Sequence, residues 1–137
     1  TGLRVEEFVN LRWSNIVGNI LHVRGKGNKY RKIPMIQKVK EVLEDMARLT
    51  HHEFGDDSLI LDIGIRQVQN IVAKYTEMSG YKTTPHGLRH TFATLLVREG
   101  ENIVDIKEYM GHGSISTTQI YFDMVERDYS NSKIHDL

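Results

Sequence analysis

The sequence of 137 residues contains no cysteine, only two prolines and no excess of either charge. Without cysteine, the chain can form neither disulfide bonds nor thiolate metal sites. Its 18 basic and 18 acidic side chains give a formal net charge of +0, so any attraction to nucleic acid has to come from a local surface. No apolar run reaches the roughly 18 residues of a membrane helix, and we expect no membrane contact.

The hydrophobic spacing predicts one domain of the α+β class that is mainly helical. A composition of 39% hydrophobic and 26% charged residues is typical of a globular domain. Short apolar runs separated by Gly18-Asn19 and Gly25–Asn28 predict a small three-stranded antiparallel sheet that ends near Pro34. The strands are expected over residues 16–17, 20–23 and 30–35. Amphipathic spacing predicts helices over residues 4–11, 37–49, 65–78, 84–100, 103–110 and 116–125.

Three polar residues mark the start of the helix that opens at Thr84-Pro85. His86, Arg89 and His90 stand at positions i, i+3 and i+4, so they share one face of that helix. An oxyanion suits such a position, because the helix dipole and the first N–H groups favour negative charge. A capped, solvated helix start explains the trio equally well. A metal pair is disfavoured, because Gly87 occupies the place where metalloproteases carry glutamate.

Two further features are suggestive but not decisive when taken alone. The predicted hairpin is basic, and Lys26 between two glycines can reach a phosphate or a leaving oxygen, although charged hairpin tips are common. Its cations are Arg24, Lys26, Lys29, Arg31 and Lys32. Later, His112 lies in a tight loop between glycines, and Tyr121 follows nine residues on. A lone histidine or tyrosine is more often structural.

Five short motifs follow one another in a characteristic order. They are Thr1–Arg4 (TGLR), Gly25–Lys29 (GKGNK), His86–Thr94 (HGLRHTFAT), Met110–His112 (MGH) and Ser116–Tyr121 (STTQIY). Each motif is modest, but together they strongly resemble the tyrosine recombinase (phage integrase) family, including its Xer-like chromosome-resolving enzymes. The resemblance covers nearly the whole chain. It implies a helical catalytic domain against which the small sheet packs.

The resemblance also implies an active site, which transfers residue by residue. The catalytic set would be Arg4, Lys26, His86, Arg89, His112 and Tyr121. Two arginines suit a phosphodiester, because a guanidinium keeps its charge and offers paired donors. A phenol with a pKa near 10 needs help to lose its proton, which His86 would provide. Lys26 would protonate the leaving 5′-oxygen, and no metal or other cofactor is required. DNA contacts are expected from Arg24, Lys29, Arg31, Lys32 and His90.

The implied activity is site-specific recombination or integration of double-stranded DNA, as in mobile elements, through a 3′-phosphotyrosyl intermediate. Residues 1–137 would form the catalytic domain, without the core-binding domain and upstream helices that relatives carry. We therefore expect weak DNA binding by these residues alone. The full-length protein would act as a homotetramer on DNA in the cytoplasm of a bacterium or archaeon, or be encoded by a phage. The alternatives are a non-catalytic DNA-binding module of the same fold and a type IB topoisomerase-like DNA-relaxing enzyme.

Overall fold

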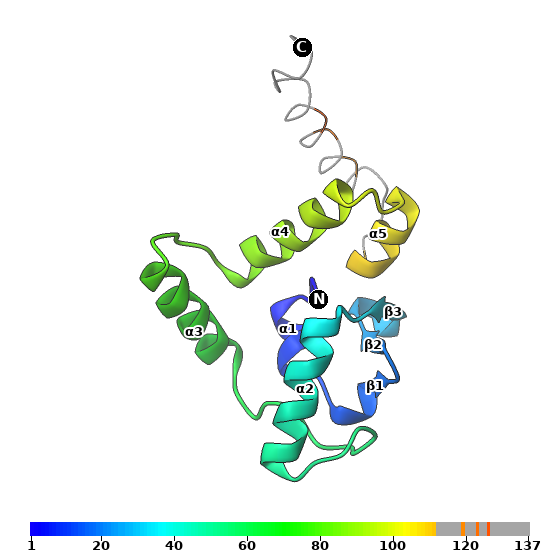
Figure 1. Cartoon of the computed structure of the whole chain (residues 1–137), viewed down its shortest axis with the longest axis vertical. Helices are drawn as coiled ribbons and strands as arrows, with labels where there is room; N and C mark the ends of the chain where they lie inside the picture. The colour runs from blue at the N-terminus through cyan, green and yellow to red at the C-terminus, as the bar shows by residue number, and fades with distance from the viewer. Residues whose placement is uncertain (112–118, 120–122, 124–125, 127–137) are drawn as a thin grey trace.

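The computed structural model describes residues 1–111 and the single positions 119, 123 and 126. Within this part, the chain forms five α-helices and one small sheet that lies to one side of them (Figure 1), which confirms the α+β, mainly helical prediction. The α-helices are α1 (Val5–Val9), α2 (Gln37–Thr50), α3 (Ile65–Met78), α4 (Pro85–Arg98) and α5 (Ile103–Met110). The strands are β1 (Ile16–Val17), β2 (Ile20–Arg24) and β3 (Tyr30–Pro34), and two short 3-10 turns are η1 (Trp13–Asn15) and η2 (Lys26–Asn28).

The sheet is antiparallel in the order β1-β2-β3, as the turn residues predict. Leu21 pairs with Ile33 and Val23 pairs with Arg31. Because side chains alternate between the faces of a strand, these four share one face. All four are buried. The register therefore carries an arginine into the interior of the molecule.

Two apolar clusters hold the elements together. The larger joins the N-terminal segment, the sheet and α2 through residues that include Leu3, Trp13, Leu21 and Ile33. The smaller lies between α4 and α5 and is built from Ala93, Val97, Ile106 and Met110. Since α5 also contacts β3, the end of α5 is brought to the edge of the sheet (Figure 1).

Local sequence signals explain where α4 begins and where α5 ends. The Thr84 hydroxyl accepts a hydrogen bond from the Gly87 N–H at 3.1 Å and caps α4, with Pro85 in its first turn. Gly111 ends α5 in the left-handed region, at φ 63°. The bounds of α3 and α5 are those predicted. In contrast, α1 ends at Val9, before the predicted residue 11.

The helix expected over residues 116–125 falls largely outside the described residues. Of the described helices, even the longest have 14 residues. None of them combines the length and the apolar character that crossing a bilayer requires.

Candidate active site

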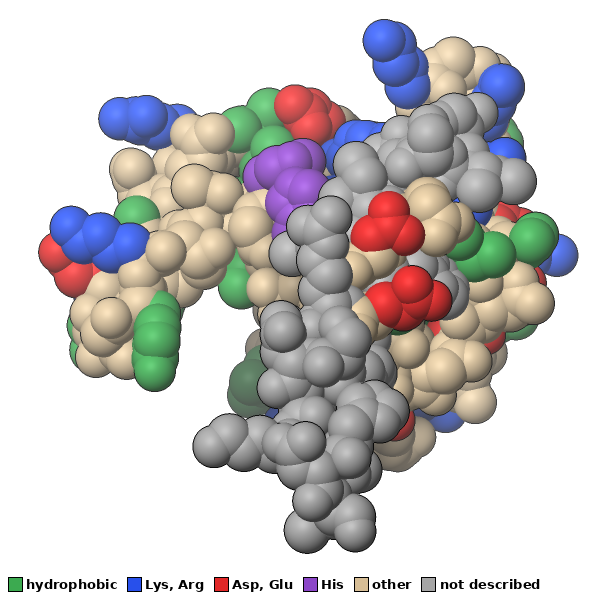
Figure 2. Space-filling view, turned by 90° about the horizontal axis from the view of Figure 1, so that it is seen from above, with side chains coloured by type: hydrophobic (Ala, Val, Ile, Leu, Met, Phe, Trp, Pro, Cys, Tyr) green, Lys and Arg blue, Asp and Glu red, His purple; other side chains and the backbone are tan. Residues whose placement is uncertain are grey.

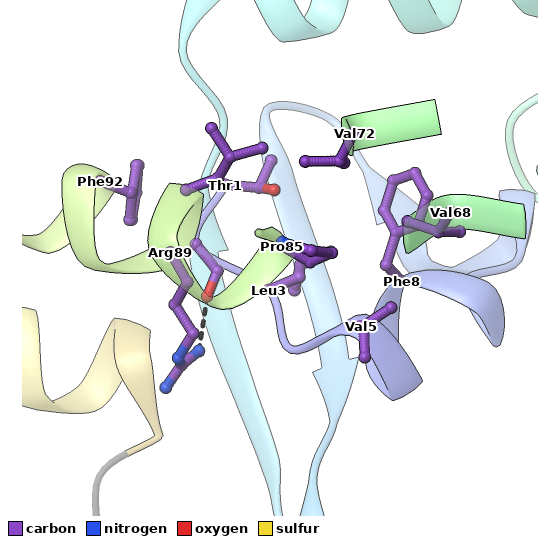
Figure 3. A pocket seen from close by; sticks show the side chains of 11 residues that line it. Thr1, Leu3, Val5, Phe8, Val68, Val72, Pro85, Arg89 and Phe92 are labelled. Atoms are coloured by element: carbon purple, nitrogen blue, oxygen red, sulfur yellow. Dashed lines mark hydrogen bonds between the residues drawn. The ribbon is translucent and has the colours of Figure 1, made fainter. Parts of the chain in front are cut away.

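Arg89 extends from α4 into the interior and is only 5% exposed. Its guanidinium donates one hydrogen bond to the Gly2 carbonyl, which Figure 3 shows, and another to the Met110 carbonyl. The Met110 carbonyl belongs to the last turn of α5, where carbonyl groups have no partner within the helix and carry the negative end of its dipole. Arg89 therefore joins the N-terminal segment to the end of α5.

Arg4 lies at the start of α1 and reaches the same place from the other side. Its Nη2 donates to the Gly111 carbonyl at 3.2 Å, and its Nη1 to Oε1 of Glu7 at 3.1 Å. The backbone N–H of Arg4 also donates to Oε2 of Glu7 at 2.8 Å. The Arg4 side chain remains 38% exposed. Two arginines that are far apart in the sequence thus bind consecutive carbonyls, those of Met110 and Gly111.

The hairpin presents most of its predicted cations to solvent. Lys26 lies in η2, between β2 and β3, and is exposed. Arg24, Lys29 and Lys32 are also exposed. These four side chains are available to a phosphate backbone that approaches the hairpin.

Arg31 does not fit the expectation that it faces DNA. Its side chain is 7% exposed and lies on the inner face of the sheet. Its guanidinium donates to both carboxylate oxygens of Glu7, at 2.7 and 2.8 Å. The physical reason is the sheet register, which pairs Arg31 with buried Val23. We therefore remove Arg31 from the set of proposed DNA contacts.

His86 and His90 form a pair on the exposed side of α4. Their Nε2 atoms are 2.7 Å apart, and their rings meet edge to face with centroids 4.3 Å apart. Figure 2 shows a patch of histidine side chains, in purple, on the face that it draws. Partial burial lowers the pKa of His90, and the nearby charges of His86 and Arg89 lower it further. A hydrogen bond between two Nε2 atoms needs one donor and one acceptor, so at least one ring is neutral.

His112 and Tyr121 lie outside the described residues. The continuous described part of the chain ends at Gly111, which directly precedes His112 and whose carbonyl accepts a hydrogen bond from Arg4. The predicted residues Arg4 and Arg89 are thus brought together at Met110 and Gly111, directly before His112 in the sequence.

One residue of this network, Glu7, was missed by reasoning from the sequence. It is buried and accepts hydrogen bonds from both Arg4 and Arg31. A usable signal was present, because an acidic residue three positions after a helix start commonly binds back to the start. Glu7 stands in that position relative to Arg4.

An apolar pocket lies beside this network, between α1, α3 and α4. Its lining includes Phe8, Val68, Val72 and Phe92 (Figure 3). Arg89 contributes its side chain to the rim, but its guanidinium points away from these apolar groups and toward the Gly2 carbonyl. The apolar lining of this pocket offers few hydrogen-bond donors to an anion. The candidate phosphate site is therefore the end of α5, where Arg4 and Arg89 meet.

Comparison with known proteins shows the family to which the chain belongs. The model of the phage integrase family matches residues 1–127, and the chain belongs to that family. It is 39% identical over 137 residues to the tyrosine recombinase XerC of Thermodesulfovibrio yellowstonii, covering 88% of this chain and 46% of that protein. It is 41% identical over 135 residues to the tyrosine recombinase XerA of Pyrococcus furiosus, again covering 88% and 46%.

Solved structures agree with this assignment. The crystal structure of a XerA recombinase matches with a TM-score of 0.80 and 31% identity, over 95% of this chain and 53% of that one. A XerH recombinase, solved in a post-cleavage complex with its difH substrate, shares the fold with a TM-score of 0.80 over 100% of this chain and 43% of that one, at 22% identity. The chain spans about half the length of the curated relatives it matches.

Proposed function

We propose that this chain is the catalytic core of a site-specific DNA recombinase that cleaves and rejoins strands through a phosphotyrosyl bond at Tyr121. The observation that carries the proposal is the meeting of Arg4 and Arg89 on the consecutive carbonyls of Met110 and Gly111. Two guanidiniums held on neighbouring carbonyls can stabilise the negative charge that builds up on a phosphoryl group under attack. Membership of the phage integrase family supports the same reading.

The proposed reaction is a transesterification in which the Tyr121 oxygen attacks phosphorus and the bond from phosphorus to the 5′-oxygen breaks. The phenolic proton passes to His86, and Lys26 donates a proton to the leaving 5′-oxygen. His112 donates a hydrogen bond to a phosphoryl oxygen. In the second step a free 5′-hydroxyl gives its proton to Lys26 and attacks the phosphorus of the 3′-phosphotyrosyl ester. The bond from phosphorus to the Tyr121 oxygen breaks, and His86 returns the proton to the phenol. One ester replaces another at each step, so no ATP is needed, and the two arginines are proposed to supply the positive charge that stabilises the phosphoryl group.

The DNA partner is proposed to contact the exposed hairpin cations Arg24, Lys29 and Lys32. His90 would contact the same DNA beside His86, its hydrogen-bonded neighbour. We further propose that the protein works as a homotetramer on DNA in the cytoplasm. Family membership supports these proposals. The basic hairpin supports the DNA contacts in particular, because a net charge of +0 provides no general attraction to DNA and the attraction has to be local.

Covalent trapping on a nicked suicide substrate tests the function. After cleavage of such a duplex, the short fragment that carries the 5′-hydroxyl diffuses away, so the protein remains attached to the 3′ end. We expect the protein as its gene encodes it to form an adduct that survives denaturing electrophoresis. Tyr121→Phe should abolish the adduct, and Tyr75→Phe, a change at an exposed position on α3, should not. An adduct that persists in Tyr121→Phe would contradict the proposal, and DNA binding without any adduct would favour a binding module.

The role of Lys26 makes a separate prediction. Lys26→Met should slow cleavage by roughly 100-fold or more, because the 5′-alkoxide would leave without a proton. A substrate with sulfur in place of the bridging 5′-oxygen should restore most of the rate, since a thiol has a pKa of only about 8.5 and leaves unprotonated. Lys38→Met, at an exposed position of α2, is the matched control. Equal loss on both substrates would exclude Lys26 as the proton donor.

A further inference from the structure

The buried guanidinium of Arg31 joins three elements of the fold. From β3, it donates to both oxygens of Glu7 on α1, at 2.7 and 2.8 Å, and through Nε to the Tyr109 carbonyl of α5 at 2.8 Å. Glu7 in turn holds the side chain and the backbone N–H of Arg4. A single arginine thus ties the hairpin to the segment that carries the first proposed catalytic residue.

Two glycines lie against this guanidinium, and each directly precedes a proposed catalytic residue. A Cβ added at Gly25, before Lys26, would lie 3.3 Å from Nη1 of Arg31. A Cβ added at Gly111, before His112, would lie 3.2 Å from Cδ, Cζ and Nε of Arg31. Both distances are tighter than ordinary contact. Arg31 therefore packs directly against the backbone on which Lys26 and His112 follow.

The end of α5 shows the same convergence from the other side. Its carbonyls at Tyr109, Met110 and Gly111 each accept a hydrogen bond from a different arginine, namely Arg31, Arg89 and Arg4 in that order. Two of these arginines, Arg4 and Arg89, are the ones proposed to bind the phosphate. The third, Arg31, holds the same turn from the inside, and its charge is matched by Glu7.

We propose that Arg31 is a positioning residue that holds three backbone segments in place relative to one another: Gly25 before Lys26, Gly111 before His112 and, through Glu7, the segment of Arg4. The inference rests on the proposed function. Its chemical basis is the planar guanidinium. It makes two parallel hydrogen bonds to the Glu7 carboxylate, which also balance its charge, and a third hydrogen bond to the Tyr109 carbonyl. A lysine retains the positive charge but cannot make all three directed bonds at once. Arg31→Lys therefore removes the alignment and leaves Glu7 with a cationic partner.

The test measures cleavage by Arg31→Lys in the protein as its gene encodes it. We expect the rate on an ordinary suicide substrate to fall on the order of 100-fold, the effect of misplacing reacting groups by about 1 Å. On the substrate with bridging 5′-sulfur, the deficit should shrink several-fold, because displacement of Lys26 no longer matters there. A loss of folding alone lowers both rates equally. Arg48→Lys makes the same change at an exposed site on α2 and should leave both rates unaltered.

A second variant keeps the test decisive if Arg31→Lys does not fold. Gly25→Ala leaves Arg31 in place, and φ of −97° at this position suits alanine, but its methyl group presses on Nη1. It should show the same partial recovery on the sulfur substrate. Cleavage at the parental rate by either folded variant, or a deficit equal on both substrates, overturns the proposal. If the parent itself forms no adduct, the proposed function fails first, which separates the two failures.

Discussion

Replacing Arg89 with alanine should lower the rate of DNA cleavage by on the order of 100- to 1000-fold. Arg89 is buried, and it is one of three arginines that bind the last carbonyls of α5; with Arg4 it forms the proposed phosphate site. The alanine variant loses a phosphate donor and also leaves the Gly2 and Met110 carbonyls without this partner. An unpaired buried carbonyl costs about 1–3 kcal/mol, so the variant should also unfold more easily.

Single-turnover cleavage of a suicide substrate, together with thermal unfolding, measures both effects. Arg66→Ala, at an exposed position of α3, is the matched control and should change neither. Arg89→Lys should recover part of the stability and little of the cleavage rate, because a lysine offers no paired donors to a phosphate. Parental cleavage by Arg89→Ala would show that this arginine is structural alone.

Replacing Glu7 with alanine should reduce the free energy of unfolding by roughly 3–5 kcal/mol. The change leaves the guanidinium of Arg31 without its carboxylate partner. The cost is high because the Arg31 side chain is only 7% exposed and water cannot replace that partner. It also frees Arg4 from two hydrogen bonds, so cleavage should fall as well. Glu6→Ala is the natural control, since Glu6 is the exposed neighbour and its substitution should cost less than about 0.5 kcal/mol. Equal stability of the two variants in urea would contradict this account.

The same carboxylate predicts how stability depends on pH. Burial raises the pKa of Glu7, but hydrogen bonds from Arg31 and Arg4 and the charge of Arg31 outweigh burial and leave the pKa below its usual value. The folded state therefore binds the proton less well than the unfolded state. The stabilisation is complete above the unfolded pKa of about 4.3 and is lost as the pH falls through the lower folded value. The stability difference between the parent and Glu7→Ala should accordingly shrink below that pH.

Much of the fold could be predicted because local signals agree with the tertiary packing. Apolar spacing and end residues such as Gly111 predicted the bounds of α3 and α5, and the turn at Gly18-Asn19 predicted the pairing of β1 with β2. Helix periodicity predicted that His86, Arg89 and His90 share one face. The contact between the two histidines confirms their part of that prediction, but Arg89 points into the interior and is buried. These features depend on neighbours in the sequence, which is why spacing alone reveals them.

The structure differs from the prediction where a charged group was assumed to seek solvent. Arg31 stands two residues before Ile33 in β3 and therefore shares its inward face, but an arginine at an inner position contradicts the usual pattern of a half-buried strand. Its partner Glu7 lies on a different element, so no local spacing pairs them. Likewise, the carbonyls that gather Arg4 and Arg89 carry no sequence signal, since every residue has one.

The most direct test of the central claim is to identify the residue that carries the DNA. The trapped complex would be digested with nuclease and protease, and the peptide that retains nucleotides would be sequenced by mass spectrometry. The account predicts a nucleotide joined through its 3′-phosphate to Tyr121. Attachment to Tyr109, linkage through a 5′-phosphate, or DNA cleavage without any peptide adduct would contradict it.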